Sequence, residues 1–119
     1  MRTNLRRALT TAMKNRDRAA ITALRSALAA IDNAESVPAE HLPSSAASNE
    51  HVAGAAVGLG AAEVERRHLT EADVRSIVEK EAVDRVSAAD EYERLGRADL
   101  AANLRAEAEV LDRQLHPES

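Results

Sequence analysis

The chain has 119 residues with 16 Lys and Arg, 20 Asp and Glu, a net charge of −4 and no cysteine. The length suits a single domain, and the lack of cysteine excludes disulfides, thiolate nucleophiles and thiolate metal sites, as expected of a cytoplasmic protein. No apolar run approaches the ~20 residues that cross a bilayer, and the N-terminus does not resemble a signal peptide, so no membrane association is predicted.

Two amphipathic helices are predicted for residues 3–15 and 17–35. Apolar residues recur there at intervals of three and four, the helical period. They are Leu5, Ala8, Leu9, Ala12 and Met13 in the first helix, and Ile21, Leu24, Leu28 and Ile31 in the second. Asp17 can cap the second helix. The short connection predicts an antiparallel hairpin.

Residues 36–68 differ in composition from the flanking segments. Pro38 and Pro43 are followed by Gly54, Gly58 and Gly60, which predicts a long, flexible linker between the second and third helices. The glycines are not followed by the Lys-Ser/Thr step of a phosphate-binding loop, so no nucleotide site is predicted.

Two more helices are predicted for residues 70–95 and 98–115. Thr70 is the expected N-cap of the first, and Gly96 is expected to adopt a left-handed conformation at its end. Val74, Ile77, Val78, Ala82, Ala89 and Tyr92 form the apolar stripe of the first helix. No strand-like alternation occurs.

The predicted fold is therefore all-α, a four-helix bundle-like pair of antiparallel hairpins. We expect one set of residues to be buried together between the hairpins. It comprises Leu9, Leu24, Leu28, Ile31, Ile77, Val78, Leu104 and Leu111.

Charge is unevenly distributed along the chain. Residues 1–35 carry seven basic and three acidic side chains, a net +4, whereas residues 69–119 carry seven basic and thirteen acidic ones, a net −6. This polarity favours docking of the N-terminal helices against the C-terminal ones.

Several short motifs occur in an order that matches a known family. They are Thr22-Ala23-Leu24-Arg25, Asn33-Ala34-Glu35, Leu69-Thr70, Lys80-Glu81, Arg85, Gly96-Arg97 and Glu107. On these motifs the chain resembles the YqeY-like proteins of the GatB/YqeY family, over about residues 2–118 apart from the middle loop. That family is similar to the tail region of the B subunit of tRNA-dependent amidotransferases.

The resemblance implies a single helical domain over residues 1–119, with the family's C-terminal tail subdomain absent. It implies a non-catalytic module that aids tRNA or enzyme binding in amidotransferases, which are carbon–nitrogen ligases with glutamine as the amide donor. The expected partners are tRNA or amidotransferase subunits. The alternative is a free-standing protein-interaction module or homodimer with no tRNA role.

Four charged residues are candidates for a polar network between helices: Arg25, Glu81, Arg85 and Glu107. Such a network could recognise a phosphate or a carboxylate, or it could be a half-buried ion network that fixes helix register. The second interpretation is favoured, because charges near a core need partners. We expect Arg25 to pair with Glu81 or Glu107.

A second set of candidates could contact RNA: Arg2, Arg6, Arg7, Arg16 and Arg18. Basic side chains bind phosphates, but no aromatic residue accompanies these to stack on bases. The alternative is that they are solvated helix ends that complement the acidic helices.

No catalytic, cofactor-binding or metal-binding residue is predicted. His41, His51, His68 and His116 lack partners at metal-ligand spacing. The carboxylates of residues 71–93 mostly form a solvated helix face.

Overall fold

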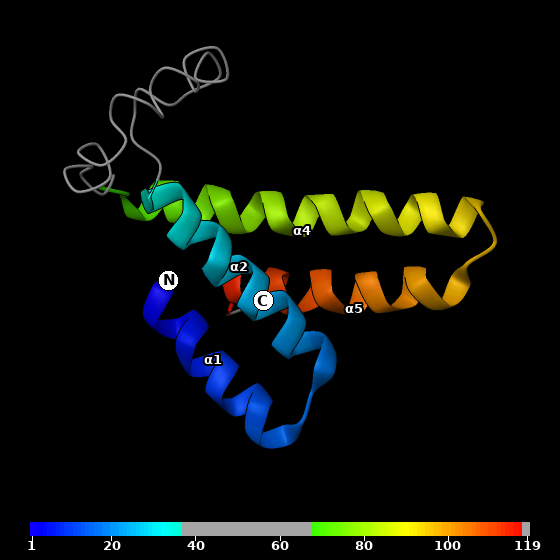
Figure 1. Ribbon diagram of the computed structural model, residues 1–119, viewed down its shortest axis with the longest axis horizontal. Helices are drawn as coiled ribbons and strands as arrows, with labels where there is room; N and C mark the ends of the chain where they lie inside the picture. The colour runs from blue at the N-terminus through cyan, green and yellow to red at the C-terminus, as the bar shows by residue number, and fades with distance from the viewer. Residues whose placement is uncertain (37–67, 118–119) are drawn as a thin grey trace, which may run out of the picture. The chain divides into compact units, whose positions relative to one another are not determined.

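The computed structural model describes residues 1–36 and 68–117, and these residues form four helices and no strand (Figure 1). The helices are α1 (Arg2–Asn15), α2 (Arg18–Ser36), α4 (Glu71–Arg94) and α5 (Ala98–Leu115). Each end lies within about one residue of its predicted position. The all-α fold class is confirmed.

The chain divides into two compact units. The first comprises Met1–Ile31 and Thr70–Ser119, and it holds every contact described below. The second comprises Asp32–Leu69, in which the described residues complete α2 and lead into α4. The predicted linker otherwise lies outside the described residues, and the assignment of residues 1–119 to one domain stays a prediction.

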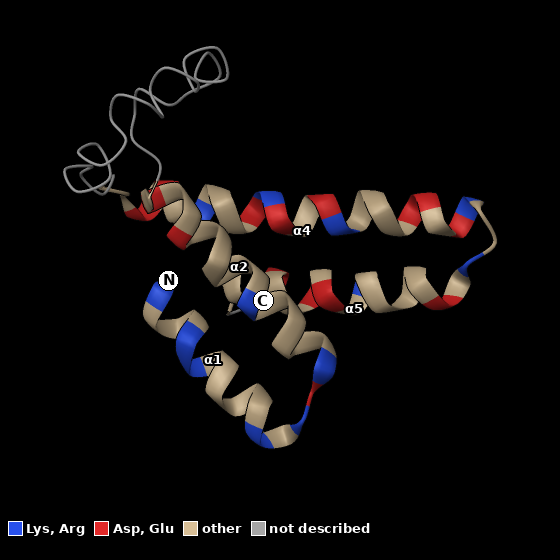
Figure 2. Ribbon diagram, viewed as in Figure 1, with Lys and Arg blue, Asp and Glu red and all other residues tan. Residues whose placement is uncertain are grey.

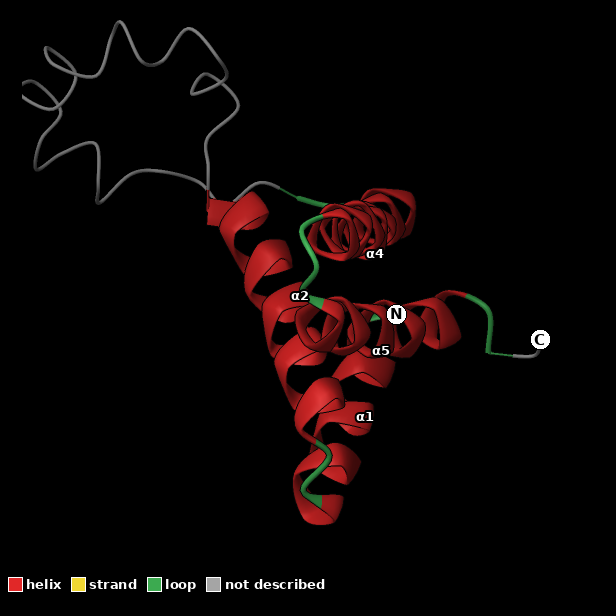
Figure 3. Cartoon of the chain, turned by 90° about the vertical axis from the view of Figure 1, so that its right-hand side faces the viewer, coloured by secondary structure: helices red, strands yellow, loops and turns green. Residues whose placement is uncertain are grey.

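A tight turn joins α1 to α2 (Figures 1 and 3). Arg16 adopts a left-handed conformation with φ of 55°, and the Asp17 amide donates a hydrogen bond of 2.9 Å to the Ala12 carbonyl. The Asp17 carboxylate then accepts a hydrogen bond from the Ala20 amide at 3.2 Å. Asp17 therefore caps α2, as predicted.

The start of α4 is held by a reciprocal cap. The Thr70 hydroxyl accepts from the Asp73 amide at 3.0 Å, and the Asp73 carboxylate accepts from the Thr70 amide at 2.9 Å. At the other end, Gly96 has φ of 81° and turns the chain into α5. The predicted roles of Thr70 and Gly96 are confirmed, and α4 and α5 pack side by side (Figures 1 and 3).

Alanines supply nearly half of the core. The buried residues are Leu5, Ala12, Ala20, Ala23, Leu24, Ala27, Ile31, Val74, Val78, Ala89, Ala101, Ala108, Val110, Leu111 and Leu115. Because alanine is small, helices that meet through it approach closely. The largest fully buried side chains are those of Leu5, Leu24, Ile31, Leu111 and Val78.

This arrangement corrects part of the predicted core. Leu24, Ile31, Val78 and Leu111 are buried as predicted. The other four residues of the predicted set are only half-buried: Leu9, Leu28, Ile77 and Leu104. Met13 and Tyr92, which continue the predicted stripes, are exposed.

Candidate functional site

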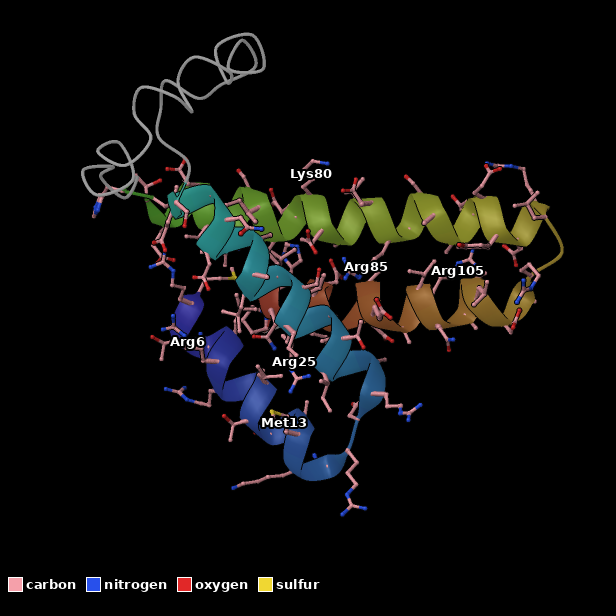
Figure 4. The ribbon with its side chains drawn as sticks, in the orientation of Figure 1. Arg6, Met13, Arg25, Lys80, Arg85 and Arg105 are labelled. Carbon is pink, nitrogen blue, oxygen red and sulfur yellow. The ribbon has the colours of Figure 1, made fainter. Side chains whose placement is uncertain are left out.

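Arg85 on α4 is the centre of a polar network (Figure 4). Its Nε donates to Glu107 Oε1 on α5 at 2.9 Å, and its Nη1 donates to Glu81 Oε1 at 2.9 Å and to the Glu81 carbonyl at 3.2 Å. The three side chains are 13–21 % exposed. Glu81, one turn before Arg85, joins it within α4, whereas Glu107 joins α4 to α5.

The contact from α2 to this network comes from Ser26 and not from Arg25. The Ser26 hydroxyl donates a hydrogen bond of 2.8 Å to Glu81 Oε1, the oxygen that also accepts from Arg85. Arg25 is exposed and forms no ion pair within residues 1–36 and 68–117. The prediction that Arg25 pairs with Glu81 or Glu107 is therefore wrong, because the neighbouring residue on α2 faces α4.

The composition of the network favours a structural role. It holds one cation and two carboxylates, and the guanidinium already donates to both carboxylates. The excess of negative charge disfavours recognition of a phosphate or a carboxylate at this position. What the network does is tie α2, α4 and α5 together at one point.

Most other basic residues of α4 and α5 are also paired with carboxylates. The pairs are Arg75 with Glu79, Lys80 with Asp84, Arg94 with Glu91, Arg97 with Asp99, and Arg105 with both Asp90 and Glu93. Hydrogen bonds to Glu93 and Asp90 raise the pKa of Arg105 above its ordinary value. The hydrogen bond to Asp84 likewise raises the pKa of Lys80. These cations are already neutralised by their neighbours.

Apart from Arg2, the basic residues of α1 and the first half of α2 are in the opposite situation. Residues 1–31 contain seven basic residues and one acidic residue, Asp17, whose carboxylate caps α2. Figure 2 shows this basic character against the mixed charges of α4 and α5. Six of these residues are exposed and form no salt bridge within the part of the chain that the structure describes. We call them the basic hairpin surface. They are Arg6, Arg7, Lys14, Arg16, Arg18 and Arg25.

A groove of about 410 Å³ adjoins this surface, between α1, α2 and the end of α5. Its apolar wall includes Ala12, Leu24 and Val110, and Arg7 and Arg113 line it from α1 and α5. Arg7 donates a hydrogen bond of 3.3 Å to the Asn4 side chain, which restricts its position. The groove therefore joins one cation of α5 to those of the basic hairpin surface.

The predicted RNA contacts are placed as follows. Arg6, Arg7, Arg16 and Arg18 belong to the basic hairpin surface, whereas Arg2 is half-buried and engaged in a contact of its own. The opposite net charges of residues 1–35 and 69–119 predicted attraction between these segments. Within the described residues, the basic hairpin surface forms no salt bridge to α4 or α5.

His68 and His116 are exposed, while His41 and His51 lie outside the described residues. Within residues 1–36 and 68–117, no group of three or more His, Cys, Asp or Glu could hold a metal ion. None of the four described helices is both long and apolar enough to span a membrane.

Sequence reasoning missed Ser26 and Arg113. Ser26 follows Ala23 by three residues and precedes Ala27, so the helical period places it beside a contact made by alanines. The predicted stripe of α2 consists of the large residues Ile21, Leu24, Leu28 and Ile31, and it therefore does not indicate the alanine face beside Ser26. Arg113 lies in the last turn of α5, and only the packing of α5 beside α1 brings it to the groove.

The α4/α5 part of the chain is similar to a known protein family. The family model for YqeY-like proteins matches residues 51–118, more than half of the chain, including all of α4 and α5. The matched segment includes three residues of the polar network, Glu81, Arg85 and Glu107. No curated protein and no solved structure matches the chain.

Proposed function

The chain belongs to the family of YqeY-like proteins, and we propose that it is a non-catalytic helical module that acts beside tRNA-dependent amidotransferases. In this proposal the basic hairpin surface contacts the phosphate backbone of tRNA. The network of Ser26, Glu81, Arg85 and Glu107 holds the helices that carry this surface. The amide chemistry, with glutamine as donor, belongs to the partner enzyme.

The observation that carries the proposal is the contrast in pairing between the two parts of the chain. The basic residues of α4 are each bound to a carboxylate, whereas Arg6, Arg7 and Arg18 have no carboxylate partner within the described residues. A cation already held by a carboxylate must lose that partner before it can bind a phosphate. Unpaired, exposed cations are free to neutralise phosphates and to release the ions condensed around RNA.

The placement of Arg6 and Arg7 supports the same conclusion. Both lie in the first two turns of α1, and the first turn of this helix contains no acidic residue. Residues 2–16 contain no Asp or Glu, so no acidic side chain of α1 competes for these cations. A bound phosphate would supply the opposite charge that α1 itself lacks.

The expected binding is weak and independent of base sequence. The chain has one Tyr and no Phe or Trp, and Tyr92 lies on α4, away from α1 and α2 in the sequence. Without aromatic side chains beside the cations, bases have no stacking surface. Backbone contacts alone depend steeply on salt concentration.

A filter-binding titration with unfractionated tRNA tests this proposal at low and at physiological salt. The double variant Arg6→Gln with Arg7→Gln should weaken binding at low salt by about ten-fold and reduce the salt slope by about 1–2. The matched control is Arg75→Gln with Arg94→Gln, which removes the same charge from α4. It should weaken binding by less than about two-fold.

Three results would contradict the proposal. Equal losses in both double variants would mean that tRNA responds only to net charge. Binding unaffected by salt would exclude a backbone contact, and undetectable binding of the wild type at low salt would exclude a tRNA role for this chain.

The lack of catalysis is tested separately. Purified protein incubated with glutamine, alone and with tRNA, should release ammonia no faster than buffer. Turnover abolished by a single substitution in this chain would overturn the non-catalytic assignment.

A second candidate, a protein-interaction module with no tRNA role, is favoured by exposed apolar residues on α4 and at its end. Val83 on α4 is 61 % exposed, and Leu95, the residue after the last of α4, is 64 % exposed. In this alternative the basic hairpin surface serves solubility. If the wild-type chain does not bind tRNA but captures a protein partner through α4, the interaction module is supported over the tRNA-binding module.

A further inference from the structure

The α4/α5 hairpin carries a second groove, which no residue of α1 or α2 lines within the described chain. Its volume is about 540 Å³. Its apolar residues are Ala82, Val83 and Val86 on α4 and Ala108 on α5. Val83 and Val86 are 61 % and 45 % exposed, so neither is used by the core.

The charged residues of this groove are predominantly acidic. Glu109 and Asp112 line it from α5, and neither forms a salt bridge within residues 1–36 and 68–117. Arg105 also lines it, but its guanidinium donates to Asp90 and Glu93 at 2.8 Å each. Two carboxylates and one cation line the groove, and that cation is held by two further carboxylates outside the lining, so Glu109 and Asp112 keep their negative charge available.

We propose that the α4/α5 groove binds a cationic amphipathic helix of a partner protein. The partner's apolar stripe would cover Val83 and Val86, and its Lys or Arg residues would pair with Glu109 and Asp112. This recognition mode needs an apolar groove with a charge opposite to that of the incoming helix. The groove has both properties, whereas the groove beside the basic hairpin surface is lined by the cations Arg7 and Arg113, which would repel a cationic helix.

The dimensions favour a short helical segment. The lining runs from Arg105 to Asp112 on α5, which is two helical turns or about 10 Å. An incoming helix presents residues i, i+3, i+4 and i+7 over that distance. Two or three apolar side chains of the partner would therefore enter the groove.

A second copy of the chain is disfavoured as the occupant. The only strongly cationic helix that the structure describes is α1, and its apolar face is already used, with Leu5 fully buried and Ala12 5 % exposed. Docking α1 into the groove of another copy would expose that face to water. The partner is therefore a different protein.

The inference goes beyond the proposed function, because it concerns a different surface and a partner of opposite charge. The two can fail independently. Arg6 and Arg7 determine tRNA binding, whereas Val86, Glu109 and Asp112 determine helix binding.

The test uses a helix-forming peptide of about 14 Leu and Lys residues, with leucines at i, i+3, i+4 and i+7. Amide signals of the full-length, isotope-labelled protein are followed by NMR as peptide is added. Shifts should be concentrated at Val83, Val86, Ala108 and Glu109. A peptide with Glu in place of every Lys should bind at least about ten-fold more weakly.

The variant Val86→Glu separates groove binding from general attraction. It adds a negative charge, so non-specific attraction predicts tighter binding of the cationic peptide, whereas groove docking predicts a loss of about five-fold or more. The matched control Leu95→Glu makes the same charge change at an exposed residue outside the groove. It should leave the affinity within about two-fold of wild type.

Charge reversal provides a second, independent measurement. Glu109→Lys with Asp112→Lys should shift the preference toward the Glu-containing peptide. Glu79→Lys with Glu91→Lys, at exposed α4 residues outside the groove, should not change it. Helical circular dichroism of each variant verifies that the fold is retained.

Three outcomes would overturn the proposal. Tighter peptide binding by Val86→Glu would show attraction without docking. Shifts spread evenly over the acidic surface would show the same. A dimer by analytical ultracentrifugation that Val86→Glu dissociates, without peptide-induced shifts, would assign the groove to a second copy.

Discussion

Ser26 on α2 donates a hydrogen bond of 2.8 Å to Glu81 on α4, although 55 residues separate them in the sequence. The accepting oxygen also receives the Arg85 guanidinium at 2.9 Å, and Arg85 in turn reaches Glu107 on α5. A single carboxylate thus connects the two helical hairpins. The stability of this connection is the basis of the first predictions.

Arg85→Ala should destabilise the protein more than any other single charge removal in α4. It leaves Glu81 and Glu107 half-buried without their cation, which should cost about 2–3 kcal/mol, less than for a fully buried pair because water reaches the side chains. Urea denaturation followed by circular dichroism measures this free energy.

The control for this prediction is Lys80→Ala, which breaks an exposed i,i+4 pair with Asp84. Exposed pairs of this kind add little to the free energy of unfolding, because water and salt screen them. Equal losses for the two variants would mean that the network around Arg85 adds nothing beyond a surface ion pair.

Ser26→Ala should cost about 1 kcal/mol, the usual net contribution of one hydrogen bond, because Glu81 keeps its contact with Arg85. Arg25→Ala should change the free energy of unfolding by less than about 0.5 kcal/mol, since Arg25 is exposed. Urea melts of these neighbouring variants compare the two residues directly. A larger loss of stability for Arg25→Ala than for Ser26→Ala would mean that Arg25, and not Ser26, contributes to the network.

Gly96→Ala should destabilise the α4–α5 turn by about 1 kcal/mol, because Gly96 has φ of 81° and side chains disfavour that conformation. No heavy atom beyond its chain neighbours lies within 4 Å of an added Cβ, so the cost comes from the backbone alone. Gly96→Asn should cost less, since asparagine tolerates left-handed conformations. Thermal melts that rank alanine above asparagine in stability would contradict this explanation.

Asp99 should titrate below its ordinary pKa of 3.8, because its carboxylate accepts hydrogen bonds from the Arg97 side chain and the Leu100 amide. A lowered pKa means that the folded state binds fewer protons than the unfolded state. The stabilisation is therefore complete above pH 3.8 and is lost as the pH falls through the folded-state pKa. NMR titration of the carboxyl carbon measures the midpoint, and Arg97→Gln should move it upward.

The amphipathic pattern and the caps were enough to predict all four helices. Thr70 and Asp17 cap helices through hydrogen bonds to residues only three positions away, and Gly96 acts within a single turn. Such interactions depend on local sequence, so they can be recognised without knowledge of the fold. The family resemblance was likewise carried by short motifs, and the match to residues 51–118 confirms it.

The predicted site was less complete for a geometric reason. Successive residues on a helix differ by about 100° in direction, so Arg25 and Ser26 both border the apolar stripe of α2 but face different neighbours. Which of them meets Glu81 depends on how α2 is rotated against α4. Ala23 and Ala27, on either side of Ser26 in the sequence, are fully buried, and alanines allow an approach that larger side chains would block.

The sequence by itself determined the helices, their caps, the family and the imbalance of charge, because each follows from local spacing or composition. Only the tertiary structure decided which charges are paired and which apolar residues stay exposed. Arg85 pairs across two helices while Arg6 and Arg7 remain unpaired within the described residues, and Val83 and Val86 face an open groove. These differences arise from distances between residues far apart in the chain, which helical packing sets and periodicity does not contain.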